Sequence, residues 1–130
     1  MALLASALSR NAALNAIGAL LNSGKLRIYS GTPPVTADTV LAGNTLLAEL
    51  AFGATAFGAA AAASMAANAI TQDTTADAAG TGTFWRGYAS DGTTCHLQGT
   101  CGTSGTDLIM NTNLIALNGI VQVTALTVSM

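Results

Sequence analysis

Hydrophobic and polar positions along the chain change their spacing at Gly24. The preceding residues, 2–22, are rich in Ala and Leu, contain no proline and predict a helix. Gly24, which follows Asn22 and Ser23, is expected to end this helix. The large apolar residues of the segment form an early pair and a later triplet at spacings of three and four, namely Leu4, Leu8, Leu14, Ile17 and Leu21.

The predicted helix has two alternative roles. It can lie as a lid on the core of its own domain, or residues 1–24 can form an arm that docks on a partner chain. In the second case the five large apolar residues are the candidate interface. Residues 25–130 then form the domain proper.

Beyond the helix, apolar and polar residues alternate in the manner of β-strands. In the last segment the alternation is strict, so Thr124 and Leu126 are expected on one side and Val123 on the other. Glycine-containing turns separate the segments, and Asp91–Gly92 is the strongest short hairpin signal among them. The predicted strands cover residues 25–30, 45–52, 83–90, 93–102, 108–117 and 120–130.

Short strands joined by such turns predict a mainly β protein, an antiparallel β-sandwich or jelly roll with an N-terminal α-helix. Residues 56–70 are the segment that the pattern leaves undecided. Their alanines favour a helix, but no broad stripe of large apolar residues supports a packed one. An extended conformation is equally open on local grounds.

Composition adds an expectation about assembly. The chain has 130 residues, of which 51% are apolar, but only 5% are aromatic and 8% charged. Much of the apolar share is alanine, which contributes little burial energy per residue. A surface with so few charges does not gain solubility from charge repulsion. We therefore expect self-association in a closed oligomer, or packing into a larger assembly.

Charge and hydropathy argue against nucleic-acid and membrane partners. The net charge is −2, and the scattered cations form no basic patch. The longest uncharged stretch, between Glu49 and Asp73, is too weakly apolar for a transmembrane helix. The N-terminal segment lacks the positive start of a signal peptide, and Arg10 interrupts its apolar run. We expect a soluble, unprocessed chain that binds neither nucleic acid nor a membrane.

One stretch suggests chemistry: CHLQGTCG, residues 95–102, which holds both cysteines and the only histidine. On a strand Cys95 and Cys101 share one face and His96 takes the other, so no Cys–His pair or three-ligand metal set forms within it. In an extended strand the two cysteine α-carbons lie roughly 20 Å apart. A disulfide allows about 7 Å, which only a sharp turn at Gly99 would provide. We expect buried structural thiols.

No other group of residues predicts catalysis or ligand binding. The acidic residues mostly fall in loops beside Gly or Thr, as turn residues do. Asp73 and Asp77 lack the spacing of a known calcium-binding loop. The glycine-rich segments GTGTFW and GTSGTD lack the lysine and the following helix of a phosphate-binding loop. The sequence therefore predicts a protein that is not an enzyme and has no catalytic, cofactor-binding or metal-binding residues.

Four segments taken together resemble a family of small proteins encoded among bacteriophage structural genes. In order, from about Gly24 to the C-terminus, they are GKLRIYSGTPP, NTLLAELAF, ANAITQDTTADAAGTGTFWRGYASDGTT and GTSGTDLIMNT. The resemblance implies a virion component, a capsid decoration (cement) protein that forms β-sandwich oligomers. It also favours an extended conformation for residues 56–70.

The resemblance implies a location and partners as well. Such a protein is made in the host cytoplasm, binds the major capsid protein on the capsid surface, and stabilises the assembled head shell. A homotrimer is favoured, because decoration proteins commonly sit at local threefold positions of an icosahedral lattice. Another virion role, as a tail, head-completion or host-attachment protein, is the alternative. A small hydrolase that uses Cys95 or Cys101 is the less favoured one.

Overall fold

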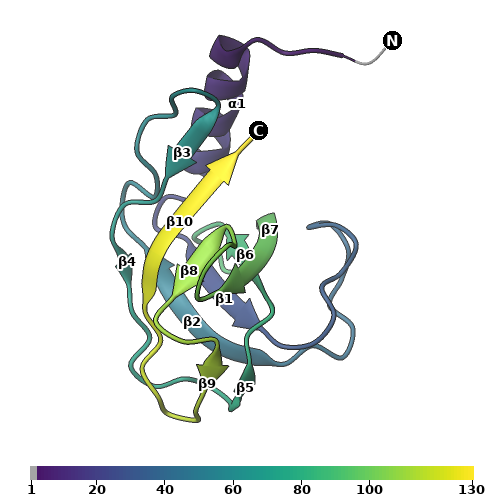
Figure 1. The fold of residues 1–130 in the computed structure, drawn as a ribbon, viewed down its shortest axis with the longest axis vertical. Coiled ribbons are helices and arrows are strands. Elements are labelled where there is room, and N and C mark those ends of the chain that lie inside the picture. The colour runs from purple at the N-terminus through teal and green to yellow at the C-terminus, as the bar shows by residue number, and fades with distance from the viewer. Residues whose placement is uncertain (1–2) are drawn as a thin grey trace.

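The computed structural model describes residues 3–130, in which a helix packs at one end of a strongly curled β-sheet (Figure 1). The helix α1 spans Ala7–Leu20. The strands are β1 (Lys25–Tyr29), β2 (Leu46–Phe52), β3 (Ser64–Ala66), β4 (Ile70–Thr71), β5 (Gly80–Thr81), β6 (Phe84–Tyr88), β7 (Cys95–Gly102), β8 (Leu108–Met110), β9 (Leu114–Ile115) and β10 (Val123–Ser129). A mainly β protein with an N-terminal helix is therefore confirmed.

The large sheet is bordered at both ends by one continuous segment of chain. Its strand order is β3-β10-β8-β7-β6-β1-β2-β4, and β5 pairs separately with β9. Because β3 and β4 follow each other in the sequence, residues 64–71 supply both outer strands. The backbone N–H of Ala67 donates to the carbonyl of Leu126, and Asp73 forms an isolated bridge with Val121. The sheet thus curls until its two ends meet along β10.

Strand pairing differs from the purely antiparallel prediction at one place. β7 and β8 run parallel, with Cys101 beside Leu108 and Gly102 beside Ile109. The other pairs in the sheet are antiparallel. The parallel pair is only two residues long, and the chain between its strands passes through Gly105 at a φ of 69°.

The helix is shorter than the predicted 2–22, of which residue 2 lies outside the described residues. It begins after Ser6, whose side-chain oxygen accepts a 3.1 Å hydrogen bond from the Ser9 N–H, as an N-cap does. The helix ends at Leu20 with Leu21 as its C-cap, before the predicted stop at Gly24, and Ser23 adopts a left-handed φ of 55° in the turn that follows. No helix among residues 3–130 has the length and apolarity needed to cross a bilayer.

Residues 56–70 form a hairpin instead of a helix. Phe57 bridges Ala67, and Ala61 bridges Ser64. The turn residues Ala62 and Ala63 have φ values of 50° and 59°, a conformation that costs an alanine energy. The extended alternative for this segment is confirmed, against the helical propensity of its alanines.

Asparagines of the helix and its C-terminal end bind this hairpin. Gly18 lets the two approach closely, since a Cβ there would lie 3.3 Å from the Cβ of Phe57. Three side-chain oxygens accept backbone N–H hydrogen bonds of 2.8 to 2.9 Å, Asn11 from Ala63, Asn15 from Ala60 and Asn22 from Ala56. The hairpin's own pairing leaves these donors free, so the helix completes their hydrogen bonding.

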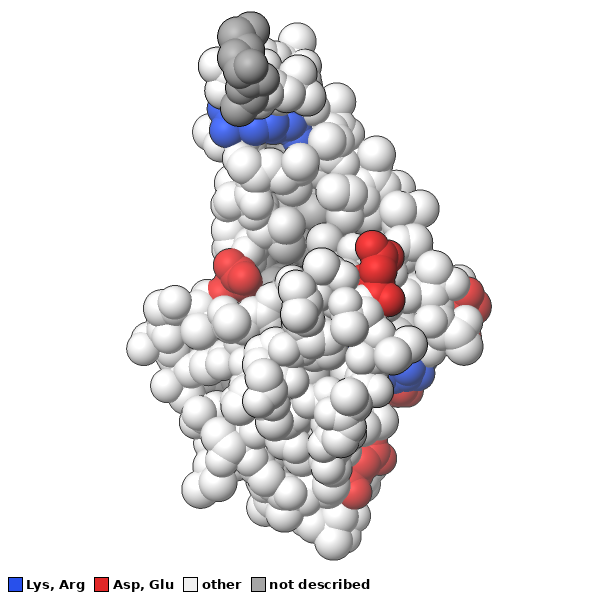
Figure 2. Space-filling view, turned by 90° about the vertical axis from the view of Figure 1, so that its right-hand side faces the viewer, with Lys and Arg blue, Asp and Glu red and all other residues white. Residues whose placement is uncertain are grey.

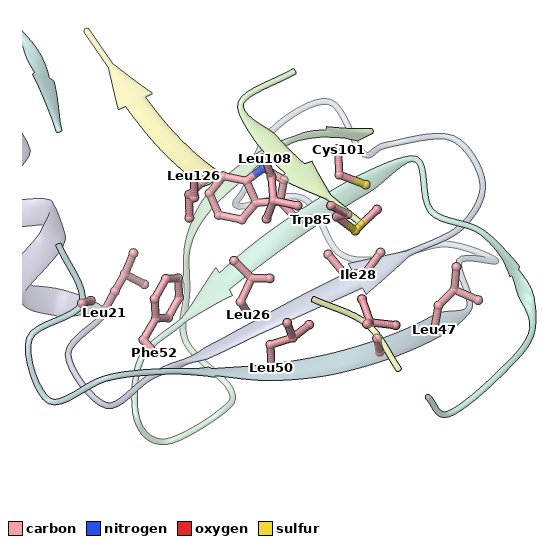
Figure 3. Packing of buried hydrophobic residues seen from close by; sticks show 14 of the residues in the cluster. Leu21, Leu26, Ile28, Leu47, Leu50, Phe52, Trp85, Cys101, Leu108 and Leu126 are labelled. Atoms are coloured by element: carbon pink, nitrogen blue, oxygen red, sulfur yellow. The ribbon is translucent and has the colours of Figure 1, made fainter. Parts of the chain in front are cut away.

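One hydrophobic core joins the helix to the sheet. Trp85 of β6 lies among Leu26, Leu108 and Leu126, and Leu21 at the end of the helix reaches the same core beside Phe52 (Figure 3). The helix therefore acts as a lid on its own domain.

A β-bulge in β10 overturns the strict alternation predicted for the last strand. The register shifts between Val123 and Ala125, so Thr124 is an extra residue on that strand. Val121 faces the core before the bulge, whereas Leu126 faces it afterwards. The inserted residue switches which positions point inward.

We expect Asn11→Ala to lower the free energy of unfolding by about 1–2 kcal/mol, because it leaves the buried N–H of Ala63 without a partner. Asn15→Ala is the matched control, because it removes an equivalent but exposed bond and should cost less. Urea denaturation of the two variants measures the difference. Equal losses would contradict the proposed role of Asn11.

Candidate functional site

The cysteines lie on opposite faces of β7, which corrects the prediction that they share one. The register between β6 and β7 shifts after Gly87: Gly87 pairs with Leu97, but the next residue, Tyr88, pairs with Cys95. His96 is therefore the extra residue of a bulge. The bulge switches the side-chain alternation, as in β10. Cys101 joins the main core, whereas Cys95 packs against a second group of residues on the outer face.

Both thiols are free and both are poor nucleophiles. Burial raises the pKa of the Cys101 thiol to about 12. Burial also raises the pKa of Cys95, and this effect outweighs the nearby positive charge of Arg86. Since the thiolate is the reactive form, both side chains are protonated and unreactive near neutral pH. Cys101 is buried as predicted, whereas Cys95 is only partly buried.

The histidine adds no chemistry to the cysteines. No hydrogen bond joins His96 to either thiol in the part of the chain that the structure describes. Within residues 3–130, no three His, Cys, Asp or Glu side chains come together as a metal site would require.

The outer face of the sheet carries a group of aromatic and charged side chains that contact and hydrogen-bond one another. The hydroxyls of Tyr29 and Tyr88 are 3.0 Å apart, and Tyr29 stacks on Phe84 with ring centroids 5.3 Å apart. The guanidinium of Arg27 lies 4.6 Å from the centroid of the Tyr88 ring and forms a 2.7 Å ion pair with Glu49. Burial and the Tyr88 hydroxyl raise the pKa of Tyr29 far above its ordinary value. The arrangement locks β1, β2 and β6 together.

Arg86 and Gln98 hold the long loop after β1 against the same face. Arg86 is only 4% exposed, and its guanidinium donates to the Gln98 side chain and to the carbonyls of Thr36 and Thr39. Gln98 in turn donates to the Pro34 carbonyl at 2.7 Å. Because these hydrogen bonds pair the buried guanidinium of Arg86 with acceptors, its charge has a structural role.

The five predicted interface residues of the N-terminal segment fall into two groups. Leu14 and Leu21 are fully buried in the protein's own core, and Ile17 packs against it. Leu14 and Leu21 therefore do not face a partner, because the sheet already covers them. Leu4 and Leu8 are 88% and 80% exposed.

The exposed leucines belong to a projecting segment that we call the N-terminal arm, residues 3–8. Leu3 is 96% exposed, and the chain from Leu3 to Ser6 runs away from the sheet without regular structure (Figure 1). Three further exposed apolar residues, Leu114, Leu117 and Ile120, lie in β9 or within five residues after it, and β9 is at the opposite end of the molecule (Figure 1). Figure 2 shows charged residues only sparsely scattered over one face of the protein.

A cavity of about 250 Å³ lies between the helix and the strands β7 and β10. The lining also includes Trp85 and the polar residues Gln98, Asp107 and Ser129. Sequence reasoning missed this site, although Gly99 within a strand is the kind of residue that marks a close approach. The apolar lining includes Leu14, Ile17, Leu97 and Val128.

Comparisons of the chain with protein-family models, curated proteins and solved structures found no match.

The buried thiol of Cys101 predicts a loss of stability at alkaline pH. The unfolded thiol loses its proton from about pH 9, whereas the folded thiol keeps it until about pH 12, so the stability present below about pH 9 declines above it. Cys101→Val should shift stability by no more than about 1–2 kcal/mol at neutral pH and should flatten the alkaline decline.

Urea denaturation at several pH values tests this effect of Cys101. Thr100→Val, a neighbouring change without a titrating group, should keep the wild-type pH dependence. An alkaline decline that is as steep in Cys101→Val as in the wild type would contradict the assignment to this thiol.

Proposed function

We propose that the protein is a structural component of a bacteriophage virion, a capsid decoration protein that binds the assembled head shell as an oligomer. The observation that carries this proposal is the surface: sparsely charged, with apolar side chains exposed at both ends of the molecule. Monomeric proteins rarely expose such patches, which mark interaction surfaces. The resemblance of the segments from Gly24 onward supplies the virion context.

The proposed mechanism is multivalent burial of uncharged surface. An oligomer that sits where several capsid subunits meet contacts all of them at once, and the linked contacts raise the overall affinity. A trimer matches a local threefold position on the shell. The oligomer would use the β-sandwich type of domain that the resemblance implies, with the major capsid protein as partner at the capsid surface after synthesis in the host cytoplasm.

The structure favours this role over the enzymatic alternative. A cysteine hydrolase needs a thiolate and a nearby base, but burial keeps the Cys95 and Cys101 thiols protonated. Neither thiol is hydrogen-bonded to His96 among the described residues. A tail, head-completion or host-attachment role remains the alternative outcome of the test below.

We expect the purified protein to co-sediment with assembled head shells of the phage that encodes it, and not with unassembled capsid subunits, because only the lattice presents several binding surfaces together. Electron microscopy of virions should show its density repeated over the shell, and light scattering should give three chains per particle. Density confined to the tail would contradict the decoration role and favour the alternative.

A further inference from the structure

A hollow on the outer face of the sheet lies between the loop after β1 and the strands β6 and β7. It measures about 360 Å³, within the range of about 300–1,000 Å³ that is typical of small-molecule sites. Arg86 lines it and is only 4% exposed. Asp38, Val40 and Thr93 also line it and are exposed, so the hollow opens to solvent. A small molecule can therefore enter the hollow and lie against a buried charge.

The positive charge of Arg86 is not neutralised by a carboxylate. Among residues 3–130 no Asp or Glu oxygen lies within ion-pair distance of its guanidinium. Its acceptors are neutral, namely the Gln98 side chain and the backbone carbonyls of Thr36 and Thr39. Neutral acceptors satisfy N–H groups, but a buried charge that has lost its hydration is stabilised further by an opposite charge. The hollow therefore favours an anion.

One nitrogen of this guanidinium is free to bind such an anion. Nε and Nη2 of Arg86 donate the three hydrogen bonds, whereas Nη1 makes none among the described residues. In this part of the chain, the unpaired side-chain nitrogens that solvent does not reach belong to Arg10 and Trp85. Nη1 of Arg86 is therefore both unpaired and accessible. Because the other hydrogen bonds already hold the guanidinium in place, a ligand does not have to order it.

The surroundings of Arg86 restrict the kind of anion. Val40, Leu41 and Tyr88 line the hollow as well, and their apolar groups suit an aliphatic chain. Asp38 adds a negative charge to the same hollow, which disfavours a dianion such as phosphate. A single carboxylate on a short aliphatic chain meets both conditions.

We propose that this hollow binds an aliphatic monocarboxylate. The carboxylate accepts hydrogen bonds from Nη1 of Arg86, and the chain packs on Val40 and Leu41. The inference does not depend on the proposed virion role, because it uses neither the N-terminal arm nor the exposed apolar residues in and after β9.

NMR titration of the isotope-labelled full chain measures this binding. We expect sodium pentanoate to shift the Nε–H resonance of Arg86 and the amides of residues 37–41 in a saturable manner. Pentanamide, the neutral isostere, should not produce these shifts, and inorganic phosphate should bind more weakly than pentanoate. Equal responses to pentanoate and pentanamide would overturn the proposal, because binding would then not involve the charge.

A second ligand identifies the source of the carboxylate. Pentanoate represents a free acid, whereas N-acetylglutamate amide presents a carboxylate as the side chain of a bound protein would. Tighter binding of pentanoate assigns the hollow to a free acid, and tighter binding of the glutamate derivative assigns it to an acidic side chain of a partner. Failure of both to bind contradicts the site.

Val40→Asp and Val35→Asp are matched variants, because both valines are exposed in the loop after β1 but only Val40 lines the hollow. We expect Val40→Asp to weaken pentanoate binding by about tenfold or more, since it places a second negative charge beside the ligand. Val35→Asp should weaken it by less than about threefold, because solvent and salt screen the more distant charge. Equal effects of the two variants would count against this hollow as the site.

Two further variants test the charges themselves. Asp38 is exposed and forms no ion pair among residues 3–130, so Asp38→Asn should keep the fold. It should tighten pentanoate binding by about threefold to tenfold, because it removes a repulsion. If Asp38→Asn binds but the wild type does not, Asp38 itself pairs with Arg86 and the proposal is overturned. Arg86→Gln should abolish binding, and if it also releases the loop after β1, the valine pair still decides.

Discussion

The pairing of β10 with both β8 and β3 is the constraint on which the rest of the structure depends. Without it, residues 64–71 would border only one end of the sheet, and the sheet would stay open. The same strand supports the alanine-rich hairpin, which in turn receives the asparagines of the helix. The C-terminus closes this arrangement, since Arg10 of the helix donates to the carbonyl of Met130 at 3.0 Å. The helix and the C-terminal residue thus lie side by side at one end of β10.

Arginines are used mainly for internal contacts, and this explains the neutral exterior. Arg27 joins β1 to Glu49 of β2 and lies over the Tyr88 ring, while Arg86 anchors the loop after β1 to β6. These charges therefore contribute to folding more than to solubility. The surface is left with small polar and apolar side chains. Such a surface suits contact with other proteins better than a monomeric state in solution.

The candidate site is the cavity between the helix and the strands β7 and β10. The curled sheet and the helix lid bury the Trp85 indole, whose N–H has no acceptor among residues 3–130. The N-cap at Ser6 fixes the helix start and leaves the preceding leucines exposed. Cys101 and Cys95 each pack with a hydrophobic group of the fold.

Local patterns in the sequence determined the helix, most strands and the Asp91–Gly92 turn, because spacing and turn chemistry act over a few residues. Only the tertiary structure decided the faces of Cys95 and Leu126, since one extra residue in a strand switches every later side chain and strand pairing selects where it is inserted. The sequence did not predict the cavity either, because its lining residues come from a helix and from strands that are far apart in the sequence. Long-range packing also overrode the helical propensity of the alanines, whose N–H groups found partners in the helix asparagines.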